Sequence, residues 1–93
     1  RGLDLKCKVK ISMIKAVLGG EVEVPTLLSK AKMRIPAGTQ PNTIFRLRGK
    51  GLSDLKTKRL GDELVEVEVE IPRKLSVKER NLLLELGKLR RES

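Results

Sequence analysis

The chain has 93 residues, and 39% of them are apolar, which is enough for one small domain with a single modest core. One cysteine and no histidine exclude an internal disulfide framework and a Cys/His zinc site, so we expect no metal or cofactor and a reducing, cytoplasmic compartment. The net charge of +9 is compatible with nucleic acid or another acidic surface as a partner.

Two further properties of the composition narrow the class of protein. No apolar run approaches the roughly 20 residues that cross a bilayer, and Arg1 opens the chain without a signal-peptide pattern. We therefore expect a soluble chain without a membrane partner, excised from a longer protein. Phe45 is the only aromatic residue, so Val, Leu and Ile must build the core, and β-branched residues favour strands.

The first and last predicted strands, residues 5–11 and 64–71, alternate between apolar and charged side chains. A period of two indicates half-buried strands, and it places Cys7 on an apolar face within the core. If the two strands are neighbours in one sheet, opposite charges face each other, and each pair contributes roughly 0.2–1 kcal/mol. We predict this pairing between Lys6, Lys8 and Lys10 on one strand and Glu66, Glu68 and Glu70 on the other.

The middle of the chain alternates between short strands and turns. Residues 12–18 have helical spacing, and Gly19-Gly20 ends that helix. Strands are predicted at 21–24, before Pro25, and at 30–35 and 44–48. Residues 49–61 form the longest gap between strands, and we expect a mobile basic projection there.

The C-terminal segment changes to a helical pattern. Ser76 is a predicted N-cap, and Glu79 completes a capping box. The following residues, up to 89, carry more leucines than a simple surface helix needs. These leucines either dock on the domain's own sheet, which is the simpler interpretation, or face a partner.

Several motifs in this order resemble one family, DnaJ, the J-domain co-chaperones. They are Asp4-Leu5, AVLGGEVEVPTL from Ala16 to Leu27, IPAGTQ from Ile35, FRLRGKG from Phe45, GDEL from Gly61 and Ile71-Pro72. The resemblance is to the second C-terminal β-domain of that family, and it covers almost the whole chain. It implies a mainly β, small two-layer sandwich-like domain over residues 4–75, with one short helix near 12–18, followed by a segment at 76–93 with a helix near 76–89.

The residues indicate a binding protein rather than an enzyme, because no acid/base pair or activated nucleophile is evident. We expect an extended peptide to add to an exposed strand edge at residues 21–25. The groove beside that edge would be lined by Val9, Ile11, Met13, Leu18, Val22 and Val24, unless these residues are simply packed core.

The DnaJ resemblance adds expectations about partners. Members of the family hold unfolded polypeptide clients and deliver them to a DnaK-type ATPase chaperone. They form homodimers through the segment after this domain, which makes Leu82, Leu83, Leu86 and Leu89 candidate dimerisation residues. A chain without histidine lacks the His-Pro-Asp motif of the J domain, so by itself it should not stimulate ATP hydrolysis.

A basic cluster supports two alternative functions. Nucleic acid is one partner, although Phe45 is placed on the buried strand face and no other aromatic ring could stack on a base. An acidic protein tail, such as a chaperone C-terminus, is the other. The cluster comprises Arg46, Arg48, Lys50, Lys56, Lys58 and Arg59.

Overall fold

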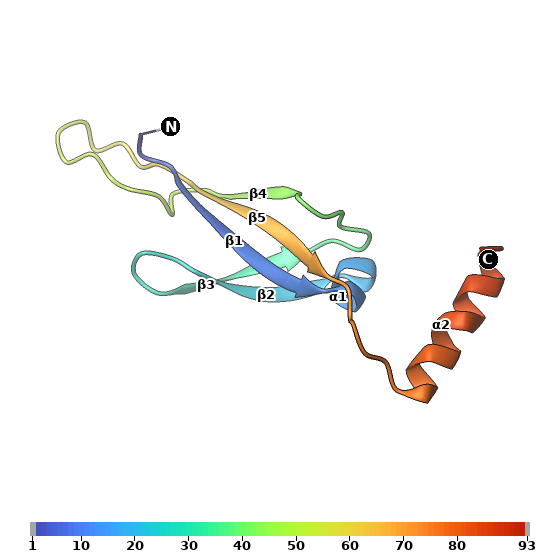
Figure 1. Cartoon of the computed structure of the whole chain (residues 1–93). Helices are drawn as coiled ribbons and strands as arrows, with labels where there is room; N and C mark the ends of the chain where they lie inside the picture. The colour runs from blue at the N-terminus through green and yellow to red at the C-terminus, as the bar shows by residue number, and fades with distance from the viewer. Residues whose placement is uncertain (1, 93) are drawn as a thin grey trace.

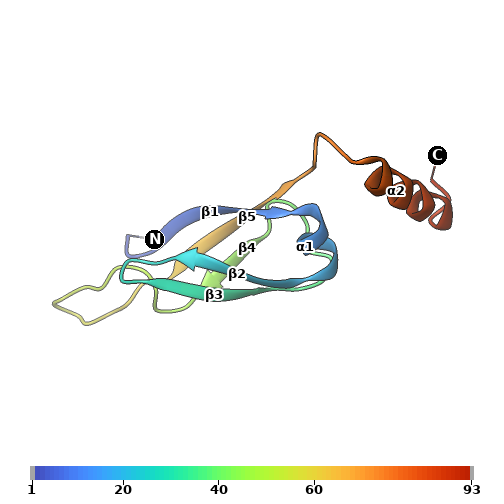
Figure 2. The same ribbon diagram turned by 90° about the horizontal axis from the view of Figure 1, so that it is seen from below.

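The computed structural model describes residues 2–92, so Arg1 and Ser93 lie outside the described part. Its elements are β1 (Leu5–Ser12), α1 (Met13–Leu18), β2 (Gly20–Pro25), β3 (Lys30–Ile35), β4 (Ile44–Leu47), β5 (Glu63–Glu70) and α2 (Val77–Leu89). A three-stranded sheet has the order β1-β5-β4, and β2 and β3 form a separate two-stranded sheet. Figures 1 and 2 show the two sheets as layers. The predicted mainly β, two-layer domain with two helices is confirmed.

Strands β1 and β5 lie side by side and run parallel. Lys8 faces Glu66 and Lys10 faces Glu68 in this register, which confirms the predicted pairing of basic and acidic strands. Lys8 Nζ lies 3.9 Å from Glu68 Oε2, a diagonal ion pair between exposed side chains. The pairing is incomplete, because Lys6 lies opposite Leu64 and Glu70 lies opposite Ser12.

The core fills the space between the two sheets. Its buried residues come from β1, α1, β2, β3 and β5, and they are Ile11, Ala16, Val24, Met33, Ile35, Val65 and Val67. Cys7 packs against this core as predicted. Burial and, secondarily, the neighbouring Glu63 carboxylate raise the pKa of the Cys7 thiol to about 11, so the thiol stays protonated at neutral pH.

Helix α1 closes one end of the sandwich. It begins at Met13 because Ser12 serves as the N-cap, with its Oγ accepting a hydrogen bond from the Lys15 amide at 3.0 Å. The helix ends at Gly19, whose φ of +85° favours glycine and whose missing Cβ would lie only 2.8 Å from the Ile35 carbonyl oxygen. The sequence therefore encodes both ends of α1 locally.

Residues 49–61, here called the arm, project from the sandwich at the end away from α2 (Figure 1). Backbone hydrogen bonds define the shape of the arm. The Gly61 amide donates to the Leu52 carbonyl at 2.8 Å, and the Asp54 amide donates to the Arg59 carbonyl at 2.8 Å. The Leu52 amide also donates to the Leu3 carbonyl at 2.7 Å. The predicted projection is present, and it has an internal ladder that the sequence analysis did not predict.

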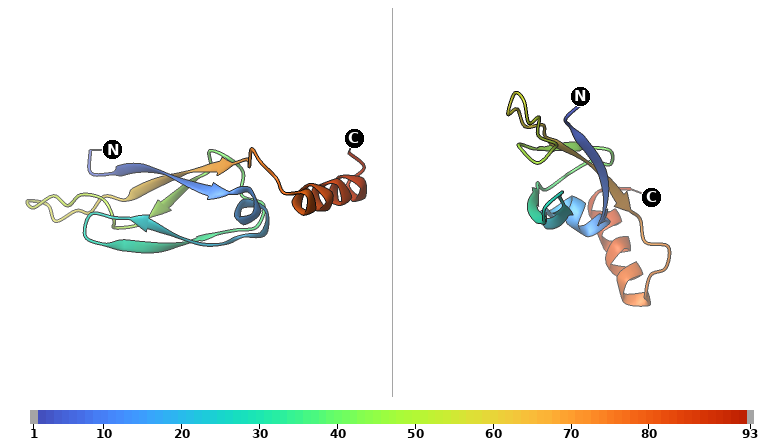
Figure 3. Two further views of the ribbon diagram at one scale, coloured as in Figure 1. Left: turned by 60° about the horizontal axis from the view of Figure 1, so that its bottom comes forward. Right: turned by 90° about the vertical axis from the view of Figure 1, so that its left-hand side faces the viewer.

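Helix α2 has the predicted capping box. The Ser76 amide donates to Glu79 Oε1 at 2.8 Å, and the Glu79 amide donates to Ser76 Oγ at 3.1 Å. Figures 1 and 3 show α2 standing away from both sheets, and none of its residues is buried.

The expectation that α2 docks on the domain's own sheet is wrong. The inner face of the three-stranded sheet is already covered by the β2–β3 hairpin. The outer face of that sheet presents lysines and glutamates, which offer the helix leucines little apolar surface.

Candidate functional site

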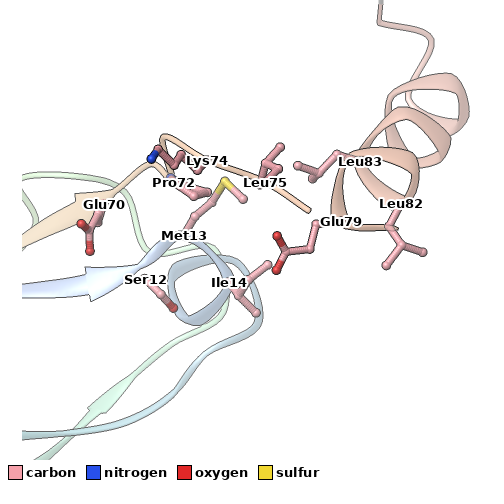
Figure 4. A pocket seen from close by; sticks show the side chains of 10 residues that line it. All are labelled: Ser12, Met13, Ile14, Glu70, Pro72, Lys74, Leu75, Glu79, Leu82 and Leu83. Atoms are coloured by element: carbon pink, nitrogen blue, oxygen red, sulfur yellow. The ribbon is translucent and has the colours of Figure 1, made fainter. Parts of the chain in front are cut away.

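An apolar groove of about 500 Å³ lies between α1, the link after β5, and α2. Figure 4 shows its lining from close by. The groove is called the α1–α2 groove below. Its lining residues are Ser12, Met13, Ile14, Glu70, Pro72, Lys74, Leu75, Glu79, Leu82 and Leu83.

Three segments supply the apolar lining of this groove. Met13 lies in the first turn of α1, where the Ser12 cap fixes its position, and points toward Pro72 and Leu75 in the link. Leu83 points toward Leu75 from α2. The charged side chains of Glu70, Lys74 and Glu79 complete the lining, so apolar side chains fit the groove and polar backbone can remain near its rim.

The six predicted groove residues do not line one common groove. Val24 and Ile11 are buried in the core, and Val9 and Val22 are half-buried against it. Leu18 is 72% exposed at the end of α1 and does not line the α1–α2 groove. Met13 alone among the six lines this groove.

The predicted edge at residues 21–25 belongs to β2. Within residues 2–92, β2 pairs only with β3, so its second side has no strand neighbour. One carbonyl on β2 is already used, because Lys15 Nζ donates to Glu21 O at 2.8 Å. An extended peptide could pair with the remaining edge groups.

The four predicted dimerisation leucines divide into two pairs. Leu82 and Leu83 line the α1–α2 groove, together with Met13. Leu86 and Leu89 lie beyond the groove, and Leu89 is 82% exposed. One residue predicted for the peptide groove, Met13, therefore lines the same groove as two leucines predicted for dimerisation.

Sequence reasoning missed Ile14, Pro72 and Leu75 as groove residues. Leu75 directly precedes the Ser76 N-cap, a position where an apolar side chain often packs at a helix start, and this signal could have identified it. Ile14 and Pro72 carried no comparable signal, because the groove exists only where α1 and the link after β5 come together in space.

The predicted basic cluster also divides. Arg46 Nη1 forms an ion pair with Asp62 Oδ2 at 2.6 Å. Hydrogen bonds from the Gly49 amide and from Arg46 lower the pKa of Asp62 below its ordinary value. Lys50, Lys56, Lys58 and Arg59 belong to the arm, while Arg48 follows β4 as an exposed side chain.

Comparison with known proteins decides the family. The sequence model of the DnaJ C terminal domain family matches residues 1–72. The chain belongs to the DnaJ C-terminal domain family. This confirms the resemblance carried by the sequence motifs.

Curated relatives agree with this assignment. The protein named "Chaperone protein DnaJ" from Erysipelothrix rhusiopathiae is 52% identical over 82 residues, covering 88% of this chain and 22% of that protein. The protein of the same name from Bradyrhizobium diazoefficiens is 51% identical over 89 residues, covering 95% of this chain and 24% of that protein. The chain thus spans about a quarter of the length of these relatives.

Within residues 2–92, no helix is long and apolar enough to span a membrane.

Proposed function

We propose that this domain works within a longer cytoplasmic DnaJ-type co-chaperone, where it binds apolar segments of non-native polypeptides for delivery to a DnaK-type ATPase chaperone. The observation that carries this proposal is the open α1–α2 groove on a domain of the DnaJ C-terminal family. The domain's own part is binding, without a catalytic step.

The chemistry of the groove suits clients of varied sequence. Ile14, Leu75 and Leu82 are all exposed, so this apolar surface faces water until a client covers it. Each CH₂ group that is then buried contributes about 0.8 kcal/mol. Met13 adds a flexible thioether that adapts to differently shaped side chains.

The free edge of β2 supports the same role. Helix α1 leads directly into β2 through Gly19, so the edge begins next to the element that carries Met13 and Ile14. Main-chain hydrogen bonds to β2 would hold a client of any sequence in an extended form. The apolar groove would then select segments rich in leucine or similar residues.

Dimerisation is the second part of the proposal. Leu86 and Leu89 extend the apolar surface of α2 beyond the groove and remain exposed. A second copy that covers them would remove this surface from water. Sedimentation of the chain, compared with the variant Leu86→Glu/Leu89→Glu, tests this part, and a monomer at all concentrations would contradict it.

An amide-resolved NMR titration with an extended, leucine-rich, uncharged peptide tests client binding. We expect shifts at Met13, Ile14, Leu75 and along β2, and we expect them to persist at high salt because apolar contacts are not screened. Met13→Glu should weaken binding about tenfold, since it places a charge in the apolar lining.

The matched control is Val17→Glu, which changes an exposed residue of the same helix outside the groove. Binding by this variant should stay within about twofold of the unmodified chain. Equal loss of binding in both variants, or shifts confined to the arm and abolished by salt, would contradict the proposed function.

A further inference from the structure

A second cleft lies at the opposite end of the molecule from α2. Figures 1 and 2 show the tip of the β2–β3 hairpin and the arm projecting at this same end. The cleft between them has a volume of about 410 Å³ and is called the tip cleft below. Four leucines from its two walls line it, namely Leu27 and Leu28 on the hairpin and Leu52 and Leu60 on the arm. Leu28 is 97% exposed, so the cleft offers uncovered apolar surface.

Hydrogen bonds define both walls of the tip cleft. At the hairpin tip, Thr26 Oγ1 donates to the Ser29 carbonyl at 2.7 Å and accepts from the Ser29 amide at 3.1 Å. At the base of the arm, the Gly51 amide donates to the Gly61 carbonyl at 3.0 Å. A Cβ at Gly61 would overlap the Leu3 carbonyl, so the arm is packed closely against the N-terminal segment. The cleft is thus part of the folded domain.

The arm, which forms one wall of the tip cleft, is rich in positive charge. The arm carries four cationic side chains, Lys50, Lys56, Lys58 and Arg59, against one carboxylate, Asp54. Lys50 itself lines the cleft. Within residues 2–92, none of the four cations lies within 4.0 Å of a carboxylate.

Three carboxylates, on the arm, directly after it and on the hairpin, already have partners. The Asp54 carboxylate accepts hydrogen bonds from the amides of Lys56 at 2.9 Å and Thr57 at 3.4 Å, which lower its pKa. Asp62 is paired with Arg46, and Glu23 lies 3.8 Å from Lys30. The four cations of the arm therefore remain available for carboxylates of a partner.

From this juxtaposition we infer that the tip cleft binds an acidic peptide segment that carries apolar side chains. The four leucines would cover the apolar side chains, while the cations of the arm would pair with flanking aspartates or glutamates. This site is separate from the α1–α2 groove, because the two share no lining residue.

Nucleic acid is the weaker match for this chemistry. Single-stranded nucleic acids bind by stacking bases on aromatic rings, and Phe45, the chain's single aromatic residue, packs against the core. Phosphates would use the cations but would leave the four leucines uncovered. A peptide with both carboxylates and leucines uses both features.

Fluorescence anisotropy with a labelled peptide of alternating leucine and glutamate tests the inference. Three comparison probes test the contributions of leucine, of glutamate and of negative charge alone. They are a peptide with serine in place of leucine, a peptide with glutamine in place of glutamate, and a single-stranded RNA of equal charge. We expect the leucine–glutamate peptide to bind tightest, and either peptide replacement to weaken binding about tenfold. Raising the salt concentration from about 0.05 M to about 0.5 M should weaken it several-fold.

Variants of the chain locate the binding. Lys56→Gln/Lys58→Gln/Arg59→Gln should weaken binding of the leucine–glutamate peptide about tenfold, and Leu28→Ser should weaken it about threefold. The control Lys6→Gln/Lys10→Gln/Lys32→Gln removes the same charge from exposed strand positions elsewhere. Binding by that control should stay within about twofold of the unmodified chain.

Several outcomes would overturn the inference. Equal binding of the serine peptide would show that the leucines are not used, and equal or tighter binding of RNA would assign the cations to phosphates. Equal losses of binding in the arm variant and its control would show that only the net charge of the chain matters. Met13→Glu distinguishes a failure of this inference from a failure of the proposed function. This variant should weaken binding of the uncharged peptide and leave binding of the leucine–glutamate peptide unchanged.

Discussion

Strand β5 and helix α2 are close in sequence and both rich in aliphatic residues, yet they differ completely in burial. Val65 and Val67 on β5 have no exposed surface, whereas Leu82 on α2 is 60% exposed. Strand β5 has a neighbour on each side, and the β2–β3 hairpin covers its inner face. Helix α2 follows a link that carries it beyond the sheets. Apolar content alone therefore does not predict burial, because burial also requires an apolar face within reach.

The largest expected effect contrasts a core residue with a helix residue. Ile35→Ala should lower the free energy of unfolding by about 2–5 kcal/mol, because Ile35 is 1% exposed and the truncation leaves a cavity. Leu82→Ala should change it by less than about 0.5 kcal/mol. Urea unfolding followed by far-UV circular dichroism measures both values.

A similar loss in both variants would show that α2 packs on the sandwich after all. Because Ile35→Ala could prevent folding of a small domain, Ile35→Val provides a milder test. It should cost about 0.5–1.5 kcal/mol.

The second contrast uses two glycines with opposite surroundings. Gly61→Ala should destabilise the sandwich by more than about 1 kcal/mol, because its Cβ would overlap Leu3. Gly87→Ala should stabilise α2 by about 0.5–1 kcal/mol, because its Cβ meets only Glu92 O, at 3.8 Å, and alanine favours helix.

Hydrogen exchange of individual amides distinguishes these effects. Gly87→Ala should raise protection in α2 and leave β5 unchanged. Raised protection in both elements would indicate that helix and sandwich unfold together.

The smallest expected effect is on the stability of the sandwich at low pH. The pKa of Asp62 is lowered from 3.8 by the Gly49 amide and by Arg46, so ionised Asp62 favours the folded state. This contribution is present above about pH 4 and is lost as the pH falls through the lowered pKa. Asp62→Asn should therefore make the stability of the sandwich depend less on pH in the acid range.

Asp62→Asn should remove only part of that dependence, because the pKa values of Asp4 and Asp54 are lowered as well. Urea midpoints between about pH 6 and pH 2 measure it. The control Glu85→Gln removes one carboxylate from α2. An unchanged pH profile for Asp62→Asn would contradict the assigned role of the Arg46–Asp62 pair.

Local patterns predicted much of the fold. Alternation identified β1 and β5, and the Ser76–Glu79 capping box marked the start of α2. The glycines after α1 marked its end. Each of these features depends on residues close together in the chain, so the sequence displays the physical cause directly.

The candidate site was less predictable. Met13 was expected in a groove with Val24 and Ile11, but those two residues face the core, and Met13 lines a groove with Leu82 and Leu83 instead. Alternation shows that a residue faces an apolar layer, but not whether another sheet covers that layer. The tip cleft was also hidden, because its leucines lie on two turns more than twenty residues apart.

The sequence by itself determined the strands, the helix caps, the charge pattern and membership in the DnaJ C-terminal domain family, because these are recorded in short-range order. Only the tertiary structure decided which apolar residues are core and which are open surface. It placed α2 away from the sheets, and it brought the arm to the hairpin tip. Such contacts depend on distances between segments that are far apart in the chain, and these distances exist only after the sheets have packed.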